Sequence, residues 1–352
     1  SVLNQSFQDF ELIIWDDCST DNSWDIILSF NDPRIHPFRN ETNLGGGNIR
    51  KAIEEVVKGD YIAIHHSDDI WESTKLEKQV NFLDNNQNFE AVFTLVNIID
   101  EAGETYTNKD HPYSQIFDQP NRSRHEWLRY FFFNGNALCM PSVLFHKSIY
   151  MKVDTCLGFY QLPDFSLWVQ FCLYGEIFIL QEKLVCFRIR EDAENWSGDR
   201  ADTRIRTQFE TLKIFEHYKK LPSINDLLRT FPQSERYINE NNADLLFALG
   251  MTVIKLGNSA QHRLFGLNLL YEAFNDPIRA NKLKIYQGFD KKDFIELTGK
   301  HDIFSLEYIR NLKIANQEMR QEVLFYALSR SWRITKPLRK FMSKIRKILN
   351  TS

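Results

Sequence analysis

Short apolar segments alternate with segments of helical periodicity over the first 190 residues, and this alternation constrains the fold more than any other feature of the chain. The strand-like segments are "FELIIW" (10–15), "RIHPF" (34–38), "DYIAIHH" (60–66) and "EAVFTLVNIID" (90–100). Helix-like segments follow three of them, at 24–30, 49–59 and 73–86. Strands joined by crossover helices predict an α/β domain that is Rossmann-like, with a mainly parallel sheet and helices on both faces.

The character of the sequence becomes helical from about residue 204. Residues 243–277 resemble one helix–turn–helix unit of the tetratricopeptide kind, broken by Gly257, and a further helix is expected over 303–329. We therefore predict three parts: an α/β domain at 1–200, a helical domain at 201–329 and a basic tail at 330–352.

Composition supports a soluble globular protein with reduced thiols. Hydrophobic residues make up 43% of the chain and charged residues 26%. The five cysteines are scattered without a CxxC pair, which is typical of a reducing compartment. No apolar run approaches the ~20 residues that a membrane-spanning helix needs.

Paired carboxylates follow two of the apolar segments. Asp16 and Asp17 come directly after the first, and Asp68 and Asp69 come shortly after "YIAI". Ligands of doubly wound sheets bind beyond the carboxyl ends of the strands, where carboxylates suit a hard divalent cation that also contacts phosphate. A single aspartate at such a place often only caps a helix, but two pairs make capping alone a weaker explanation.

The ordered segments "SVLNQSFQDFELIIWDDCSTDNS" and "NLGGGNIRKAIEEVVKGDYIAIHHSDD" resemble the family 2 inverting glycosyltransferases of GT-A fold. The resemblance runs through about residue 190. It implies transfer of a hexosyl or deoxyhexosyl group from a nucleotide-diphosphate sugar. Since the chain starts at "SVLNQSF" without methionine, we interpret it as cut from a longer protein, with the family's first strand expected before residue 1.

The resemblance also implies roles for individual residues. Asp17 matches the aspartate that pairs with the nucleotide base, Asp68 the one that faces the ribose, and Asp69 the ligand of Mg²⁺ or Mn²⁺. Arg50 matches the basic residue after the glycine loop, and the alternative is a solvated helix residue. The bound metal would offset charge on the departing diphosphate.

The segment at 160–190 matches the acceptor side of the family, where an acidic residue precedes a "xLW" helix. By that match Asp164 is the general base that deprotonates the acceptor hydroxyl, and the alternative is a cap of the helix that follows. Trp168 is expected in the core rather than in the sugar site.

The chain departs from the family pattern at more than one place. Lys51 stands where many members have asparagine. Many members carry "yRiH" after the last strand, with the histidine near the metal. This chain reads "FRIRED", so Arg190 stands there and is expected to meet phosphate instead. His65 and His66 precede the acidic motif, and we assign neither as a ligand.

The tail is strongly basic. After Glu322 there is no acidic residue, and apolar residues recur at helical spacing among the cations, which are Arg330, Arg333, Lys336, Arg339, Lys340, Lys344, Arg346 and Lys347. It resembles the carboxyl end of bacterial surface-polysaccharide glycosyltransferases. A basic amphipathic helix suits an anionic bilayer surface; nucleic acid is not expected as a partner, since no recognition module accompanies the tail.

The sequence therefore predicts a metal-assisted inverting glycosyltransferase of bacterial cell-surface polysaccharide assembly. Its partners would be a nucleotide-sugar donor and a lipid-linked or polysaccharide acceptor, and it would lie at the cytoplasmic face of the membrane. Two alternatives remain open: a sugar nucleotidyltransferase, and a catalytically inactive module that binds nucleotide or glycan or acts as a scaffold.

Overall fold

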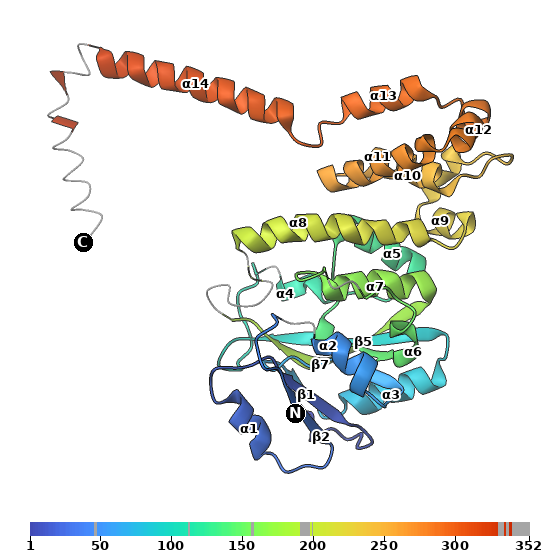
Figure 1. The fold of residues 1–352 in the computed structure, drawn as a ribbon. Helices are drawn as coiled ribbons and strands as arrows, with labels where there is room; N and C mark the ends of the chain where they lie inside the picture. Colours follow the sequence, from blue (N-terminus) through green and yellow to red (C-terminus); the bar gives the residue numbers. More distant parts are fainter. Residues whose placement is uncertain are drawn as a thin grey trace. The chain divides into compact units, whose positions relative to one another are not determined.

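The structure is a computed structural model that describes residues 1–45, 48–111, 113–155, 158–190, 198, 200–329, 334–335 and 338–339. It divides into two compact units, Ser1–Phe294 and Ile295–Ser352. The predicted division at residue 200 remains a prediction. The elements of the first unit are labelled in Figure 1. Four of the six predicted site residues lie in its turns and loops, and the other two lie in short or buried helices: Asp17, Asp68, Asp69 and Arg190 in the first group, and Arg50 and Asp164 in the second.

The strands of the first unit form two sheets. A small sheet pairs two parallel strands, β1 (Leu12–Asp16) and β2 (Ile35–Arg39). The larger sheet has the order β3-β6-β5-β7-β4, and its strands are β3 (Tyr61–Ala63), β4 (Ile70–Trp71), β5 (Phe89–Ile99), β6 (Leu144–His146) and β7 (Glu176–Arg188).

The α/β class is confirmed, but the larger sheet is mixed rather than mainly parallel. Only β5 and β7 pair in parallel there, whereas β6 runs antiparallel to both β3 and β5, and β4 runs antiparallel to β7. β6 and β4 have three and two residues, too few to produce a periodic signal in the sequence.

Helices cover both faces of the larger sheet, as predicted (Figure 1). Alternate residues of β5 point to opposite faces: Ala91 and Phe93 join one hydrophobic core, and Val92 and Val96 join the other. The helices of this part are α1 (Ser23–Ser29), α2 (Asn48–Lys51), α3 (Lys75–Asn85), α4 (Tyr113–Ile116), α5 (Arg124–Asn134), α6 (Lys147–Tyr150) and α7 (Pro163–Tyr174).

The helix α7 is the most deeply buried of these and carries one of the site residues. Nine of its twelve residues are buried. Trp168 is fully buried and packs edge-on against Phe93, with the ring centroids 4.8 Å apart, so its expected core position is confirmed. A helix packed this firmly gives its first turn a fixed place.

The first unit continues into helices, as predicted from the sequence. These are α8 (Ala201–Phe215), α9 (Ile224–Thr230), α10 (Leu245–Leu256), α11 (Ala260–Asn275), α12 (Pro277–Gln287) and α13 (Lys291–Lys300), the last crossing into the second unit. The predicted helix–turn–helix corresponds to α10 and α11. A Cβ atom on Gly257, between them, would lie 2.4 Å from the Cβ atom of His262, so only glycine fits this turn.

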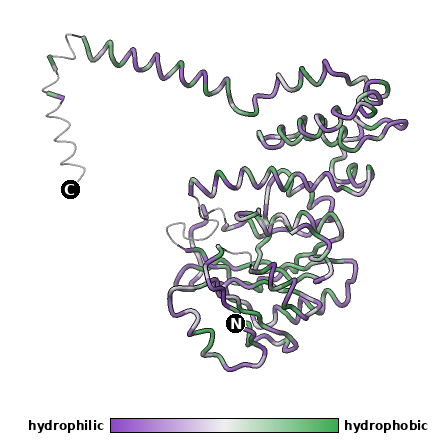
Figure 2. The backbone as a smooth tube through the Cα atoms, in the orientation of Figure 1, coloured by the Kyte–Doolittle hydropathy of each residue, from purple (hydrophilic) through white to green (hydrophobic). Residues whose placement is uncertain are grey.

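The second unit contains α14 (Leu306–Leu328), close to the predicted helix at 303–329. None of its residues is buried, and hydrophobic and hydrophilic residues alternate along it (Figure 2). No helix among the described residues has the length and hydropathy to cross a membrane. Except for residues 334, 335, 338 and 339, the predicted basic tail lies outside the described residues.

Candidate active site

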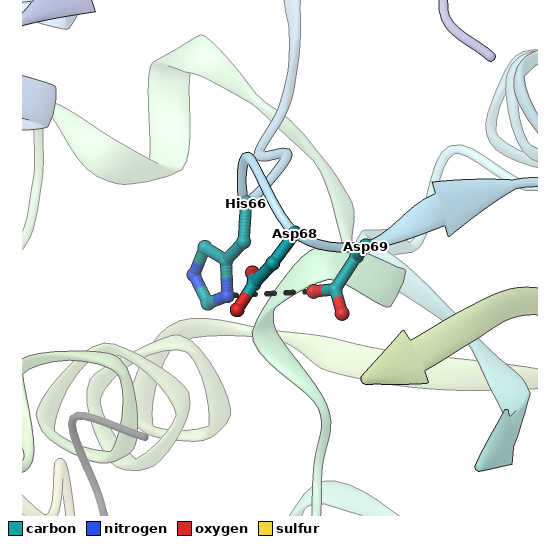
Figure 3. Close-up of side chains that lie close together, drawn as sticks. All are labelled: His66, Asp68 and Asp69. Atoms are coloured by element: carbon teal, nitrogen blue, oxygen red, sulfur yellow. Dashed lines mark ion pairs between the residues drawn. The ribbon is translucent and has the colours of Figure 1, made fainter. Parts of the chain in front are cut away.

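The turn between β3 and β4 gathers three groups that can ligate a metal. Asp68 and Asp69 come immediately before β4 and His66 lies just after β3. One ligand atom from each of the three lies within 4.8 Å of the others. Figure 3 shows the three side chains gathered on this turn. The sequence analysis assigned neither histidine as a ligand, whereas the structure places a ring nitrogen of His66 close to both carboxylates. A ligand role for His66 is therefore a new candidate from the structure.

Asp69 is held tightly on one side and lacks a partner on the other. Its side chain is 1% exposed, and Oδ1 accepts a hydrogen bond from the backbone N–H of Arg188 at 2.9 Å. Within the described part of the chain, Oδ2 has no hydrogen-bond partner, and the Nδ1 atom of His66 lies 3.6 Å away. Burial, with a smaller effect of neighbouring Asp68, raises the pKa of Asp69 to about 7.

These residues fit a divalent cation. A buried carboxylate oxygen without a partner costs free energy, and a cation beside it would remove that cost. The other available ligands, a second carboxylate and an imidazole, suit Mn²⁺ or Mg²⁺ when phosphate or water completes the shell. Burial lowers the pKa of His66, which keeps its imidazole neutral, as a metal ligand must be.

Four of the predicted site residues line one cavity of about 2130 Å³: Arg50, Asp68, Asp164 and Arg190. His66 lines the same cavity. Asp17 and Asp69 are not among the described residues that line it. The structure thus brings the acidic turn and Asp164 to one space.

Asp17 lies at the edge of this space and holds a loop. Its Oδ1 atom accepts hydrogen bonds from the side chain of Asn40 at 2.6 Å and from the backbone N–H of Leu44 at 3.0 Å. Leu44 and Gly45 line the cavity. Asp17 therefore shapes the cavity wall through the loop that it anchors.

The two predicted arginines differ in their surroundings. Arg190 lies beside the acidic turn, with its Nε atom 3.3 Å from Oδ2 of Asp68. Arg50 is not the freely solvated helix residue of the alternative interpretation: its Nε atom donates to Glu54 at 2.8 Å and its guanidinium to the carbonyl of Thr155 at 3.0 Å. Both cations are thus located where an anionic group in the cavity could reach them.

Asp164 lies in the first turn of α7. The N-cap of that helix is Leu162, and Asp164 is its second residue, so it is not the cap that the alternative interpretation proposed. The side-chain amide of Asn136 donates to its Oδ2 atom at 2.8 Å. Burial raises the pKa of Asp164 to about 6, against the opposing effects of the Phe165 N–H and Asn136. A carboxyl with such a pKa can accept a proton near neutral pH.

Three contributors to the site were not identified from the sequence. His66 is adjacent to the acidic motif, so its position in the chain was a usable signal. Asn136 and Arg188 act through contacts with residues 28 and 119 positions away, and nothing in the local sequence indicates such contacts.

Comparison with known proteins assigns the amino-terminal part to a family. Residues 1–150 match the family model described as glycosyl transferase family 2. An uncharacterized glycosyltransferase of Methanocaldococcus jannaschii is 28% identical over 223 residues, which cover 62% of this chain and 70% of that protein.

Two Escherichia coli proteins, WfaP and WfgD, are both named UDP-Glc:alpha-D-GlcNAc-diphosphoundecaprenol beta-1,3-glucosyltransferase. WfaP is 29% identical over 176 residues, covering 50% of this chain and 63% of WfaP. WfgD is 40% identical over 90 residues, covering 25% of this chain and 36% of WfgD. Residues 1–150 of this chain thus belong to glycosyl transferase family 2 and are part of a glycosyltransferase domain of GT-A-like fold.

Proposed function

We propose that the chain transfers a sugar from a nucleotide-diphosphate sugar to a hydroxyl group of a lipid-linked or polysaccharide acceptor, with inversion at the anomeric carbon. The observation that carries this proposal is that Asp164, a half-buried carboxyl with a raised pKa, shares one cavity with Asp68 and His66 of the acidic turn. A reaction that needs both a proton acceptor and an anchored diphosphate can use these groups of one cavity.

The acidic turn would hold the donor. Asp69, Asp68 and His66 would ligate Mg²⁺ or Mn²⁺, which supplies Lewis-acid stabilisation of the departing diphosphate. Arg190 and Arg50 would add positive charge on the phosphate side, since both line the cavity. Asp17 would contact the base, at the loop that carries Leu44.

Asp164 would activate the acceptor. Its carboxylate takes the proton of the acceptor hydroxyl while the hydroxyl oxygen forms a bond to the anomeric carbon. The bond from that carbon to the diphosphate breaks, and the nucleoside diphosphate leaves with the electron pair. Attack from the face opposite the leaving group inverts the anomeric centre, and Asn136 keeps the carboxylate oriented.

The names of two relatives and the charge of the tail support the proposed acceptor class. WfaP and WfgD are named for a diphosphoundecaprenol-linked sugar acceptor, which resides in a membrane. The cations of residues 330–352 would attract the chain to an anionic leaflet by up to about 1 kcal/mol each. We therefore propose that the protein is a peripheral protein of the inner membrane face. Co-sedimentation with anionic but not zwitterionic vesicles, lost when residues 330–352 are removed, is the expected result, and equal binding to both vesicle types would contradict it.

The transfer proposal is tested with a panel of UDP-, dTDP- and GDP-sugars, Mn²⁺ and a GlcNAc-diphosphoprenol acceptor. Wild-type chain should transfer one of the sugars, whereas Asp69→Asn and Asp164→Asn should not. Asp118→Asn is the matched control, because that carboxylate is about half exposed and pairs only loosely with Lys183 at 4.0 Å.

Other outcomes would favour the alternatives. Release of pyrophosphate from a nucleoside triphosphate and a sugar phosphate would indicate a nucleotidyltransferase. Absence of any metal-dependent heat on titration with nucleoside diphosphates would indicate a scaffold. Wild-type transfer by the Asp164→Asn variant would overturn the assignment of the base.

A further inference from the structure

A buried glutamate in the helical region binds the backbone directly before Asp164. Glu210 belongs to α8, and only 2% of it is exposed. Its Oε1 atom accepts hydrogen bonds from the N–H groups of Tyr160 at 3.0 Å and Gln161 at 3.1 Å. Its Oε2 atom accepts from Gln161 at 2.8 Å and Leu162 at 2.7 Å. One carboxylate thus binds three consecutive backbone N–H groups.

These N–H groups belong to the segment that leads into α7. Leu162 is the N-cap of that helix, and its side chain makes no capping hydrogen bond. Its backbone N–H donates to Glu210. A negative charge at a helix N-terminus is also favourable. Only Pro163, whose φ angle is fixed by its ring, separates Leu162 from Asp164. A shift of the Leu162 backbone would therefore also shift the Asp164 carboxyl.

A second residue of α8 reinforces the same segment. The guanidinium of Arg206 lies 4.8 Å from the ring centroid of Tyr160 and donates to the Gln161 side chain at 3.4 Å. On the other side, Asn136 holds the Asp164 carboxylate itself. Two groups thus hold Asp164 in place: α8 fixes the backbone that precedes it, and Asn136 fixes its carboxylate.

We propose that Glu210 is a positioning residue for transfer: it fixes the segment 160–162 so that the Asp164 carboxylate meets the acceptor hydroxyl. This inference rests on the proposed function, because it takes Asp164 as the base. It makes α8 part of the catalytic apparatus, although the chain reaches α8 only after the family 2 match has ended at residue 150.

The burial and the charge of Glu210 agree with a positioning role. Burial is the main cause of the raised pKa of Asp164, and the negative charge of nearby Glu210 adds a smaller contribution. A buried carboxylate is costly unless it is hydrogen-bonded, and here the bonds go to the backbone of one loop. An apolar residue would fill this space at lower cost if packing alone were needed.

The experiment compares Glu210→Gln, Glu210→Asp and wild type in steady-state transfer, in titration with nucleoside diphosphate and Mn²⁺, and in amide hydrogen exchange. Glu216→Gln is the control, since that residue lies next to the end of the same helix and pairs with Lys219 at 2.7 Å with its side chain 35% exposed. Glu210→Gln replaces one acceptor oxygen by a donor and removes the charge.

We expect Glu210→Gln to lower kcat by about 10²-fold, the scale of a 1 Å misplacement of a reacting group. The nucleotide affinity should stay within about twofold of wild type, and Glu210→Asp should recover part of kcat because it keeps the charge. Amide protection should fall at residues 160–162 and not in β5 or α10. The control should match wild type in each measurement.

Two results would overturn the proposal. Unchanged kcat with unchanged protection at residues 160–162 would show that Glu210 does not position this segment. A fall in kcat accompanied by equal loss of nucleotide affinity and of protection throughout the first unit would show a general structural role. If wild type transfers no sugar, the proposed function fails. The exchange measurement would then still decide whether Glu210 fixes residues 160–162.

Discussion

Replacing Asp164 by asparagine should remove activity and raise stability at the same time. The pKa of Asp164 is raised from 3.8 to about 6 in the folded chain. The folded state therefore holds the proton more tightly than the unfolded state. Ionisation of this carboxyl therefore lowers the free energy of unfolding. This loss is absent below pH 3.8, grows between pH 3.8 and about 6, and is complete above about pH 6. The pKa difference corresponds to about 3 kcal/mol at most.

Asparagine has nearly the same shape and no charge, so Asp164→Asn should be more stable than wild type at pH 8 by up to this amount. The difference should nearly vanish near pH 3.5, where the wild-type carboxyl is protonated in the folded state and largely protonated in the unfolded state. Urea unfolding at several pH values, monitored by tryptophan fluorescence, measures the free energies of unfolding of the wild type and the variant.

The same pKa determines how kcat falls at acidic pH. About nine-tenths of the Asp164 carboxyl is ionised at pH 7 and about a tenth at pH 5, so kcat should fall about tenfold between these values. A kcat that does not change between pH 7 and 5, together with an Asp164→Asn variant that is less stable than wild type at pH 8, would refute the reasoning.

Three further predictions concern the metal, the core and the helical region. Asp69→Asn should abolish Mn²⁺ binding measured by electron paramagnetic resonance, and His66→Ala should weaken it. The Mn²⁺ affinity of the wild type should fall below pH 7, because burial raises the pKa of Asp69 to about 7. Unchanged Mn²⁺ affinity in both variants would exclude this site. Trp168→Ala should lower the free energy of unfolding by about 3–5 kcal/mol through the cavity left beside Phe93, and a loss below 1 kcal/mol in urea titration would contradict its core position. A chain ending at residue 200 should lose transfer and cooperative unfolding because α8 is removed, and a stable, active product by calorimetry and assay would contradict this.

Local sequence patterns predicted several strands and the helical hairpin well. β1, β2 and β5 lie within a residue or two of their predicted positions, and α10 and α11 match the expected hairpin around Gly257. The antiparallel pairing of β6 was not predictable, because a three-residue strand carries no period and its partners lie far away in the sequence. Strand alternation alone therefore suggested a more parallel sheet than the one observed.

In the candidate site, too, local motifs identified some residues, whereas others became apparent only from tertiary contacts. Asp68 and Asp164 were chosen from motifs, and the cavity that they share depends on tertiary structure. His66 was within reach of sequence reasoning, since it precedes the acidic pair by two positions. Glu210 was not, because its four hydrogen bonds reach a segment about 50 residues earlier. In the sequence, an isolated glutamate in a helix looks like any solvated one.

The anomeric configuration of the first transfer product, read by proton nuclear magnetic resonance, tests the central claim most directly. A carboxylate that only removes the acceptor proton permits a single displacement, so an α-linked nucleotide sugar should yield a β-linked product. A product that keeps the configuration of the donor would contradict the role given to Asp164 and the account built on it.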